Sequence, residues 1–159
     1  QGYSCAPGDD LPKKARLRLQ ELDRLGTIGF AAKRVPGLFF EPEKNPALVA
    51  KAAAAMSGIN VRGYTQAVHM LSSGNLSSVA AGVSVPSLVV VGAQDTITPE
   101  DQSDRAHEAL SKAAPHLAHT FAIVEAAGHA VHQQQPDTVA ETISGFLKQD
   151  LTAELEVMQ

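Results

Sequence analysis

Residues 85–99 read Val-Pro-Ser-Leu-Val-Val-Val-Gly-Ala-Gln-Asp-Thr-Ile-Thr-Pro, and residues 120–129 read Thr-Phe-Ala-Ile-Val-Glu-Ala-Ala-Gly-His. In the first stretch, the apolar run Ser87–Val91 lies between a proline and a glycine, which predicts a strand buried on both faces of a parallel sheet. The second stretch predicts another strand that ends in a Gly-containing turn. Asp95 and His129 therefore each come just after a strand.

The segment between these strands is predicted to be a helix. Thr98 is expected to cap it, Pro99 suits its first position, and an acid follows three residues after the cap, so that the helix runs to about Ala113. A helix that joins two parallel strands makes a right-handed crossover and leaves both strand ends at one edge of the sheet. We therefore expect Asp95 and His129 to lie near each other.

In this order and spacing, the two stretches resemble the carboxyl-terminal portion of the α/β-hydrolase fold, in which the chain order is nucleophile, acid, histidine. The resemblance rests on Pro-x-Leu-Val-Val-Val-Gly-x-x-Asp-x-x-x-Pro, on the Ala-Gly-His turn, and on a closing helix with Gln-Pro-Asp-x-Val-x-x-x-Ile-x-x-Phe-Leu. It covers roughly Leu11 to Lys148 and looks most like the small-molecule esterases and lactonases, including the 3-oxoadipate enol-lactonases. It implies an α/β fold with a few parallel strands, flanking helices and a helical cap.

The resemblance also implies roles for the two polar residues. Asp95 matches the acid and His129 the general base of a Ser-His-Asp triad. Two positions depart from the common pattern of the family. Gln134 stands where a Glu is frequent, two residues before Pro136, and Ala130 stands where an aromatic residue commonly follows the histidine. Neither departure removes the catalytic chemistry, but both weaken an assignment to a subfamily.

The nucleophile of this family lies on a Gly-x-Ser-x-Gly turn between a strand and a helix, upstream of the acid. Residues 2–6 imitate the pattern around Ser4, but no strand can precede it in this chain and residues 7–10 cannot continue as a helix. Residues 82–86 also contain Gly and Ser but lead into a strand. We therefore expect a serine on a preceding segment or on a second polypeptide, and a chain that is inactive and does not fold alone.

Three regions are expected along the chain. Residues 1–80 are predicted to form the helical cap, and residues 81–150 the last two strands and helices of the core. Residues 151–159 are predicted to be a tail that extends the last helix or docks on a neighbour.

The pattern of apolar residues and stop signals predicts four cap helices. The first should keep Leu17, Leu22 and Leu25 on one side and end at Gly26. The predicted helices span residues 11–25, 27–34, 45–57 and 59–72.

A cap over the triad would enclose the substrate and exclude water. Arg34 and Arg62 are candidate partners for a substrate carboxylate, although an arginine on a helix surface is usually just solvated. The other candidate substrate contacts imply a mainly apolar pocket, and each is also explained as a core residue. They are Phe39, Phe40, Tyr64, Val68 and His69, together with Leu38, Met56 and Met70.

Metal and cofactor chemistry are not indicated. The histidines other than His129 lack metal-ligand spacing with supporting carboxylates, so we expect no metal and no cofactor. His132, three residues beyond His129, is its local competitor as the general base.

The composition describes an ordinary soluble domain. Of 159 residues, 44% are apolar and 19% charged, and the net charge of −4 argues against nucleic acids and anionic membranes as partners. No stretch approaches the ~20 apolar residues of a membrane span. A single cysteine, Cys5, excludes an internal disulfide and is compatible with the cytoplasm, where we expect the protein.

The sequence thus predicts an enzyme that hydrolyses a small ester or lactone by acyl transfer to water. Small molecules are its expected partners. The alternatives are a non-catalytic protein that uses the same fold to bind a ligand, or a related enzyme that cleaves carbon–carbon bonds, halides or epoxides. In the last two, the nucleophile is typically an Asp, which we would expect outside residues 1–159. The presence of both Asp95 and His129 favours the enzyme, because a pure scaffold needs neither.

Overall fold

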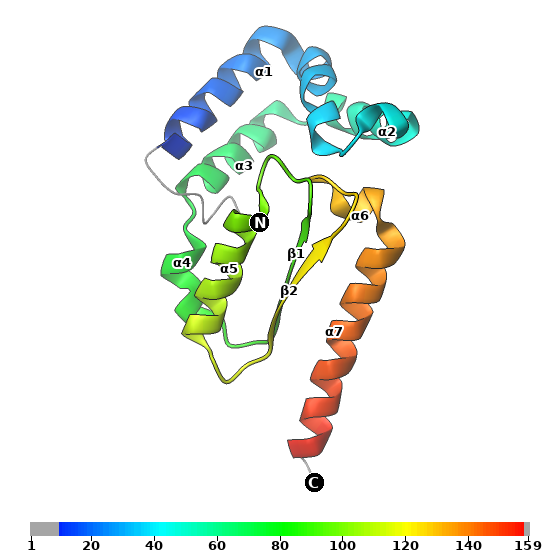
Figure 1. Cartoon of the computed structure of the whole chain (residues 1–159). Helices are drawn as coiled ribbons and strands as arrows, with labels where there is room; N and C mark the ends of the chain where they lie inside the picture. The colour runs from blue at the N-terminus through cyan, green and yellow to red at the C-terminus, as the bar shows by residue number, and fades with distance from the viewer. Residues whose placement is uncertain (1–9, 158–159) are drawn as a thin grey trace.

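The computed structural model describes the backbone of residues 10–157 and the side chains of residues 10–148. Within this range, helices surround one two-stranded sheet (Figure 1). The elements in chain order are α1 (Asp10–Arg34), η2 (Pro36–Leu38), η3 (Pro42–Lys44), α2 (Pro46–Ser57), α3 (Val61–Ser73), α4 (Leu76–Val79), η4 (Ala80–Gly82), β1 (Ser87–Gly92), α5 (Glu100–Ala113), β2 (His119–Val124), α6 (Val131–Gln134) and α7 (Pro136–Val157).

The two predicted strands and the helix between them are confirmed. Strands β1 and β2 pair in parallel, from Ser87 opposite His119 to Gly92 opposite Val124. Helix α5 packs on both strands, while α7 flanks the sheet on the other side (Figure 1). The parallel register brings the carboxyl ends of both strands to one edge, so the loops that follow them are neighbours.

The prediction that β1 is buried on both faces was wrong for most of the strand. Only Val91 and Gly92 are buried, and residues 87–90 are partly exposed. Val85 and Ile123 are also exposed. Among the described residues, β2 is the one strand that pairs with β1. One edge of β1 therefore has no neighbouring strand to cover it within this part of the chain.

Helix α1 consists of the first two predicted helices. Gly26 breaks it with φ 63° and ψ 173°, as its role as a stop signal predicted. The prediction for Leu17 was wrong, because this side chain is 54% exposed. Ala15 and Leu22 are the buried residues of this half. They lie about two turns apart on one face, whereas Leu17 is turned by about 200° from Ala15.

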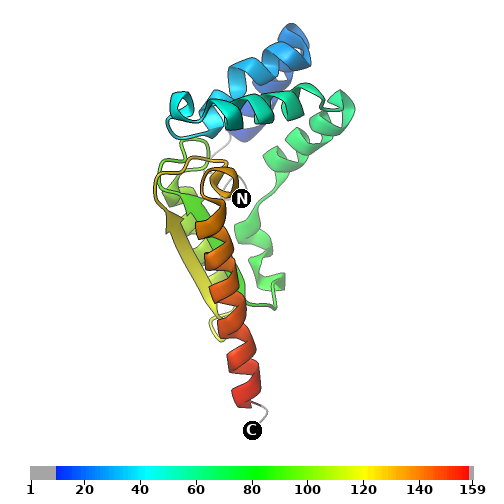
Figure 2. The same ribbon diagram turned by 90° about the vertical axis from the view of Figure 1, so that its right-hand side faces the viewer.

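Helices α1, α2 and α3, here called the cap helices, lie beyond the carboxyl ends of the strands, and α2 and α3 both pack on α1 (Figures 1 and 2). Phe30 of α1 meets Tyr64 of α3 edge to face, with ring centroids 5.5 Å apart. Half-buried side chains of α2 pack against a buried cluster. The cluster consists of Ala31, Val35, Phe39 and Ala130. Because Ala130 directly follows His129, the core of the cap helices reaches the predicted site.

Helix α7 closes the described chain. It begins at Pro136, as the Gln-Pro-Asp pattern predicts, and continues to Val157, so the predicted tail extends the helix as far as the structure describes it. Ile143 and Leu147 on this helix are exposed. None of the described helices is both long enough and apolar enough to cross a membrane.

Candidate active site

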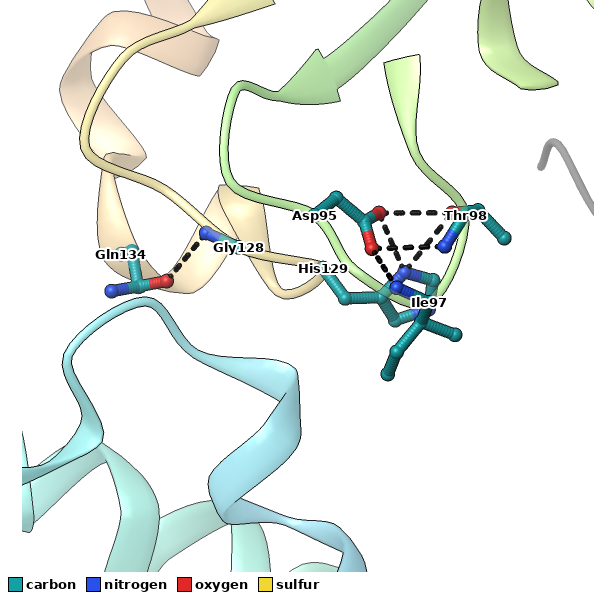
Figure 3. Close-up of polar contacts among 6 residues, drawn as sticks. All are labelled: Asp95, Ile97, Thr98, Gly128, His129 and Gln134. Carbon is teal, nitrogen blue, oxygen red and sulfur yellow. Dashed lines mark hydrogen bonds and ion pairs between the residues drawn. The ribbon is translucent and has the colours of Figure 1, made fainter. Parts of the chain in front are cut away.

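Asp95 lies in the loop after β1 and is 7% exposed (Figure 3). Its Oδ1 atom accepts hydrogen bonds from the backbone N–H groups of Ile97, at 2.8 Å, and Thr98, at 2.9 Å. The loop therefore folds around the carboxylate of one of its own residues, an arrangement that Asp favours because its side chain reaches the backbone two and three residues on. The second oxygen, Oδ2, faces the turn that carries His129.

His129 lies in the turn after β2 and approaches Asp95 as predicted. Its Nδ1 atom is 2.8 Å from Asp95 Oδ2 (Figure 3). Because a carboxylate only accepts, Nδ1 carries a proton, and in the neutral form of the ring Nε2 keeps its lone pair. The His129 side chain is 22% exposed, whereas that of Asp95 is 5% exposed. The pair thus consists of a buried acid and an imidazole that retains some access from outside.

Thr98 is a third member of this group that the sequence did not reveal. Its hydroxyl donates to Asp95 Oδ2 at 2.9 Å and lies 3.2 Å from His129 Nδ1 (Figure 3). The prediction that Thr98 caps α5 was wrong. The cap position is Pro99, without a side-chain bond, because Asp95 engages both the backbone and the hydroxyl of Thr98. The spacing Asp-x-x-Thr was the available signal.

The charge of Asp95 follows from these contacts. Burial alone would raise the pKa of the carboxyl group, because it disfavours the charged form. The hydrogen bonds from Thr98 N–H, the His129 ring, Ile97 N–H and the Thr98 hydroxyl outweigh burial and hold the pKa below its ordinary value of 3.8. Asp95 is therefore an anion at neutral pH and fixes the tautomer of His129.

The two loops are joined by their backbones as well as by this pair. Gln94 N–H donates to Ala127 O at 2.9 Å, and Gln94 Oε1 accepts from Ala127 N–H at 3.0 Å. A Cβ atom on Gly92 would lie 2.4 Å from the carbonyl oxygens of Ala127 and Gly128, so only glycine allows the strand to approach the turn this closely. This close approach fixes the position of the turn, and with it the position of His129, relative to the loop that carries Asp95.

The segment that follows α1 holds the other side of the turn. Ala130 N–H donates to Leu38 O at 2.9 Å, and the Ala130 side chain is buried beside Val35 and Phe39. A larger aromatic side chain at this position would displace that cluster, which accounts for the departure from the family pattern at Ala130. Gln134, the other departure, also bonds the turn (Figure 3).

A comparison with solved structures finds the same arrangement of elements elsewhere. An esterase from Thermogutta terrifontis matches with a TM-score of 0.76 and 20% sequence identity, over 92% of this chain and 53% of that one. The enol-lactonase from Burkholderia xenovorans LB400 matches with 0.74 and 21%, over 86% and 51%. The chain has the fold of the carboxyl-terminal part of an α/β-hydrolase. A hydrolase from Pseudomonas aeruginosa PA01 matches with 0.73 and 18%, over 90% and 52%.

The chain spans about half the length of each of these α/β-hydrolase structures. A scan against protein-family models finds no match, and a search of curated proteins finds no relative. The likeness therefore lies in the fold, as the resemblance in the sequence predicted.

The predicted substrate contacts fall into two groups in this α/β-hydrolase fold. Phe39 and Phe40 lie against the His129 turn, since a Cβ atom on Gly128 would be 2.8 Å from Phe40 N and 3.0 Å from Phe39 C. The other group belongs to α3. In it, Tyr64 packs on Phe30, Val68 is buried against α1, and His69 is exposed. No hydrogen bond or ring contact described here joins this second group to the His129 turn.

The remaining candidates are dispersed. Arg34 stacks over Phe30, with its guanidinium carbon 5.3 Å from the ring centroid, and Arg62 is exposed. Leu38 accepts the bond from the His129 turn through its backbone, and Met56 packs on the buried cluster. Met70 is exposed.

The other histidines make contacts outside the Asp95–His129 pair. His107 stacks on Phe121 with centroids 5.7 Å apart, and His119 bonds the Ala114 carbonyl at 3.1 Å. His132, the predicted competitor of His129, is exposed on α6. Over the described range, no three His, Cys, Asp or Glu side chains gather in a group that could hold a metal ion.

Of the two imitations of the nucleophile turn, only the one around Ser84 lies within the described residues. Ser4 lies outside the described residues. Ser84 is exposed and precedes β1, so it stands at the amino end of the strand, away from Asp95 at the carboxyl end. Ser84 is therefore not placed to be activated by His129.

Proposed function

We propose that the protein is a hydrolase of small esters or lactones that works by nucleophilic acyl transfer to water. The observation that supports this most directly is the Asp95–His129 pair, 2.8 Å apart at the carboxyl ends of neighbouring strands. Fold alone does not imply function, but an ionised acid that orients an imidazole is the arrangement that activates a serine. The names of the similar structures, an esterase and an enol-lactonase, agree with this substrate class.

In this mechanism Asp95 holds the proton on Nδ1 of His129, so that Nε2 can take the proton of the nucleophile. The nucleophile is a serine on a preceding segment or on a second polypeptide, and the chain alone lacks activity. The serine attacks the substrate carbonyl while His129 accepts its proton. The imidazolium then returns the proton to the leaving alcohol or enol, and the same base activates water in the second half of the reaction.

The cap helices are proposed to cover the substrate. Of the five predicted contacts, Phe40 is tied to the His129 turn through Gln134, and we assign to it the position nearest the reacting bond. Phe39 and Val68 are buried within the packing of the helices. Tyr64 and His69 would line the outer part of an apolar pocket. A cytoplasmic location fits a chain with one cysteine.

Covalent labelling tests the proposal. The full-length protein is incubated with a serine-directed fluorophosphonate and analysed by denaturing intact-mass measurement and peptide mapping. We expect one label on one serine, slowed at least a hundredfold in His129→Gln, while the exposed control His132→Gln is labelled at the normal rate. The mass analysis also shows whether the serine lies on this polypeptide or on another. Absence of labelling in the wild-type protein would instead favour a ligand-binding protein or an Asp nucleophile.

A further inference from the structure

Gln134 joins the His129 turn to a segment far away in the sequence. Its Oε1 atom accepts two backbone hydrogen bonds, from Phe40 N–H at 2.9 Å and from Gly128 N–H at 2.8 Å. Its Nε2 atom donates to Phe40 O, also at 2.9 Å. Figure 3 shows the Gln134 side chain reaching Gly128, directly before His129. One amide thus bonds both polar groups of Phe40 and the residue next to the histidine.

These contacts require an amide. Two N–H groups converge on one end of the side chain, which must therefore be an oxygen, and a carbonyl oxygen faces the other end, which must therefore be the NH₂ group. An ionised carboxylate could accept the two N–H bonds but would set its second oxygen against Phe40 O. The Gln found in place of the Glu frequent in the family is therefore matched to its partners.

Both neighbours of His129 are attached to the same segment. Gly128 is bonded to Phe40 through Gln134, and Ala130 N–H donates to Leu38 O at 2.9 Å. The backbones are already in close contact, because a Cβ atom on Gly128 would lie 2.8 Å from Phe40 N. Hydrogen bonds on both sides of His129 therefore connect it to residues 38–40.

We propose that Gln134 is a positioning residue. Through it, the orientation of the His129 imidazole toward Asp95 depends on where residues 38–40 lie against the His129 turn. Its importance for turnover rests on the proposed function, whereas the coupling between the segment and the histidine does not. A displacement of the segment, for example when a substrate enters under the cap helices, moves the base of the candidate triad with it.

The test uses the ¹⁵N-labelled full-length protein with three variants. Gln134→Met keeps the length of the side chain and removes every hydrogen bond. Gln134→Glu keeps the shape and can donate only when the carboxyl group is protonated. Gln133→Glu, at an exposed neighbouring position, is the control for the charge. Exchange of the Phe40 and Gly128 amide hydrogens and the ¹⁵N signals of the His129 ring are measured by NMR.

We expect Gln134→Met to reduce the exchange protection of both amides about tenfold or more and to replace the single Nδ1–H tautomer of His129 by a mixture. Gln134→Glu should behave like Gln134→Met at neutral pH and recover wild-type protection of both amides once the carboxyl group is protonated. Gln133→Glu should match the wild type at each pH. This recovery on protonation is a signature that general loss of stability does not produce.

Two results would overturn the proposal. One is loss of amide protection in Gln134→Met with an unchanged His129 tautomer, which would leave Gln134 a structural residue only. The other, decisive even if Gln134→Met does not fold, is a Gln134→Glu protein whose protection and tautomer match those of Gln133→Glu at every pH. The NMR signals are independent of catalysis, so a wild-type protein that takes no fluorophosphonate label would refute the proposed function and leave this test standing.

Discussion

Asp95 and His129 follow neighbouring strands, yet the two loops are held in different ways. The Asp95 loop is bonded by its own residues, through the N–H groups of Ile97 and Thr98 and the Thr98 hydroxyl. The turn that carries His129 relies on residues outside it. Leu38 and Gln94 are distant in the sequence, and Gln134 is near but is itself bonded to the distant Phe40. The acid is therefore placed by local structure, and the histidine by the tertiary fold.

This difference predicts which substitutions affect only the chemistry of the pair and which also affect the stability of the fold. A change in the Asp95 loop should alter the chemistry of the pair and leave the cap helices in place. A change in the packing around the His129 turn should instead weaken the whole described structure, because the strand, the turn and residues 38–40 meet there without spare room. The experiments below separate the two effects, from the largest expected change to the smallest.

Asp95→Asn should lower turnover of a nitrophenyl ester by about 10⁴-fold with little change in melting temperature. The Asn oxygen can still accept from Ile97 and Thr98, so the loop keeps its shape. The amide group now donates where the carboxylate accepted, which forces His129 into the wrong tautomer. Steady-state kinetics of the full-length protein check this, and activity within tenfold of the wild type would exclude Asp95 as the acid.

Gly92→Ala should destabilise the fold by about 3 kcal/mol, at the upper end of the cost of overpacking. The new Cβ atom would start 2.4 Å from two backbone oxygens, which cannot rotate away as a side chain can. Urea unfolding measures the loss. Gly37→Ala, where a Cβ atom meets nothing within 4 Å, is the matched control and should be neutral or slightly stabilising. Equal stability of the two variants would contradict the close approach.

The same contrast explains what the sequence could predict. The meeting of Asp95 and His129 followed from two strand signals and the topology of parallel sheets, which are local patterns combined with one general rule. The break of α1 at Gly26 was equally local. Gln134 had no such signal, because Phe40, the partner that it joins to the turn, lies 94 positions away and an isolated Gln has no periodicity. Its odd place in the family pattern was the only trace of its role.

Two errors have a related cause. Thr98 was assigned to the helix cap because its type is common there, but Asp95 three residues earlier competed for the same backbone group and the same hydroxyl. Leu17 was assigned to the buried side by residue type, although the helix turns it away from Ala15 and Leu22. Residue type alone was therefore misleading in both places: at Thr98 a neighbouring side chain competed, and at Leu17 the geometry of the helix decided which side is buried.

Thr98→Val should cost about 1 kcal/mol of stability, the usual net value of one buried hydrogen bond, with almost no change of volume. Loss of the hydroxyl leaves Asp95 Oδ2 with the His129 N–H as its remaining side-chain donor, so the pKa of Asp95 should rise. NMR titration of the carboxyl carbon follows the pKa. Thr98→Ser, which keeps the hydroxyl, should restore it; a pKa that is equal in both variants would show that the hydroxyl is irrelevant.

Acid should produce the smallest change. Because the pKa of Asp95 is lower in the folded than in the unfolded chain, its contribution is complete above the ordinary value of 3.8 and is lost as the pH falls through the folded-state pKa. Unfolding in urea between pH 6 and pH 2 should therefore show a loss of stability that is smaller in Asp95→Asn. The same acid profile in both proteins would mean that Asp95 gains nothing from its partners.

The bond between Phe40 and Gln134 also has a consequence for the order of folding. It joins positions 94 apart, whereas the contact between Asp95 and His129 spans 34. Longer loops cost more entropy to close, and such contacts are slow to form. The strands and α5 are thus expected to assemble first, and residues 38–40 to dock last. A newly made chain acquires its sheet early, but His129 is held on both sides only when the last contact has closed.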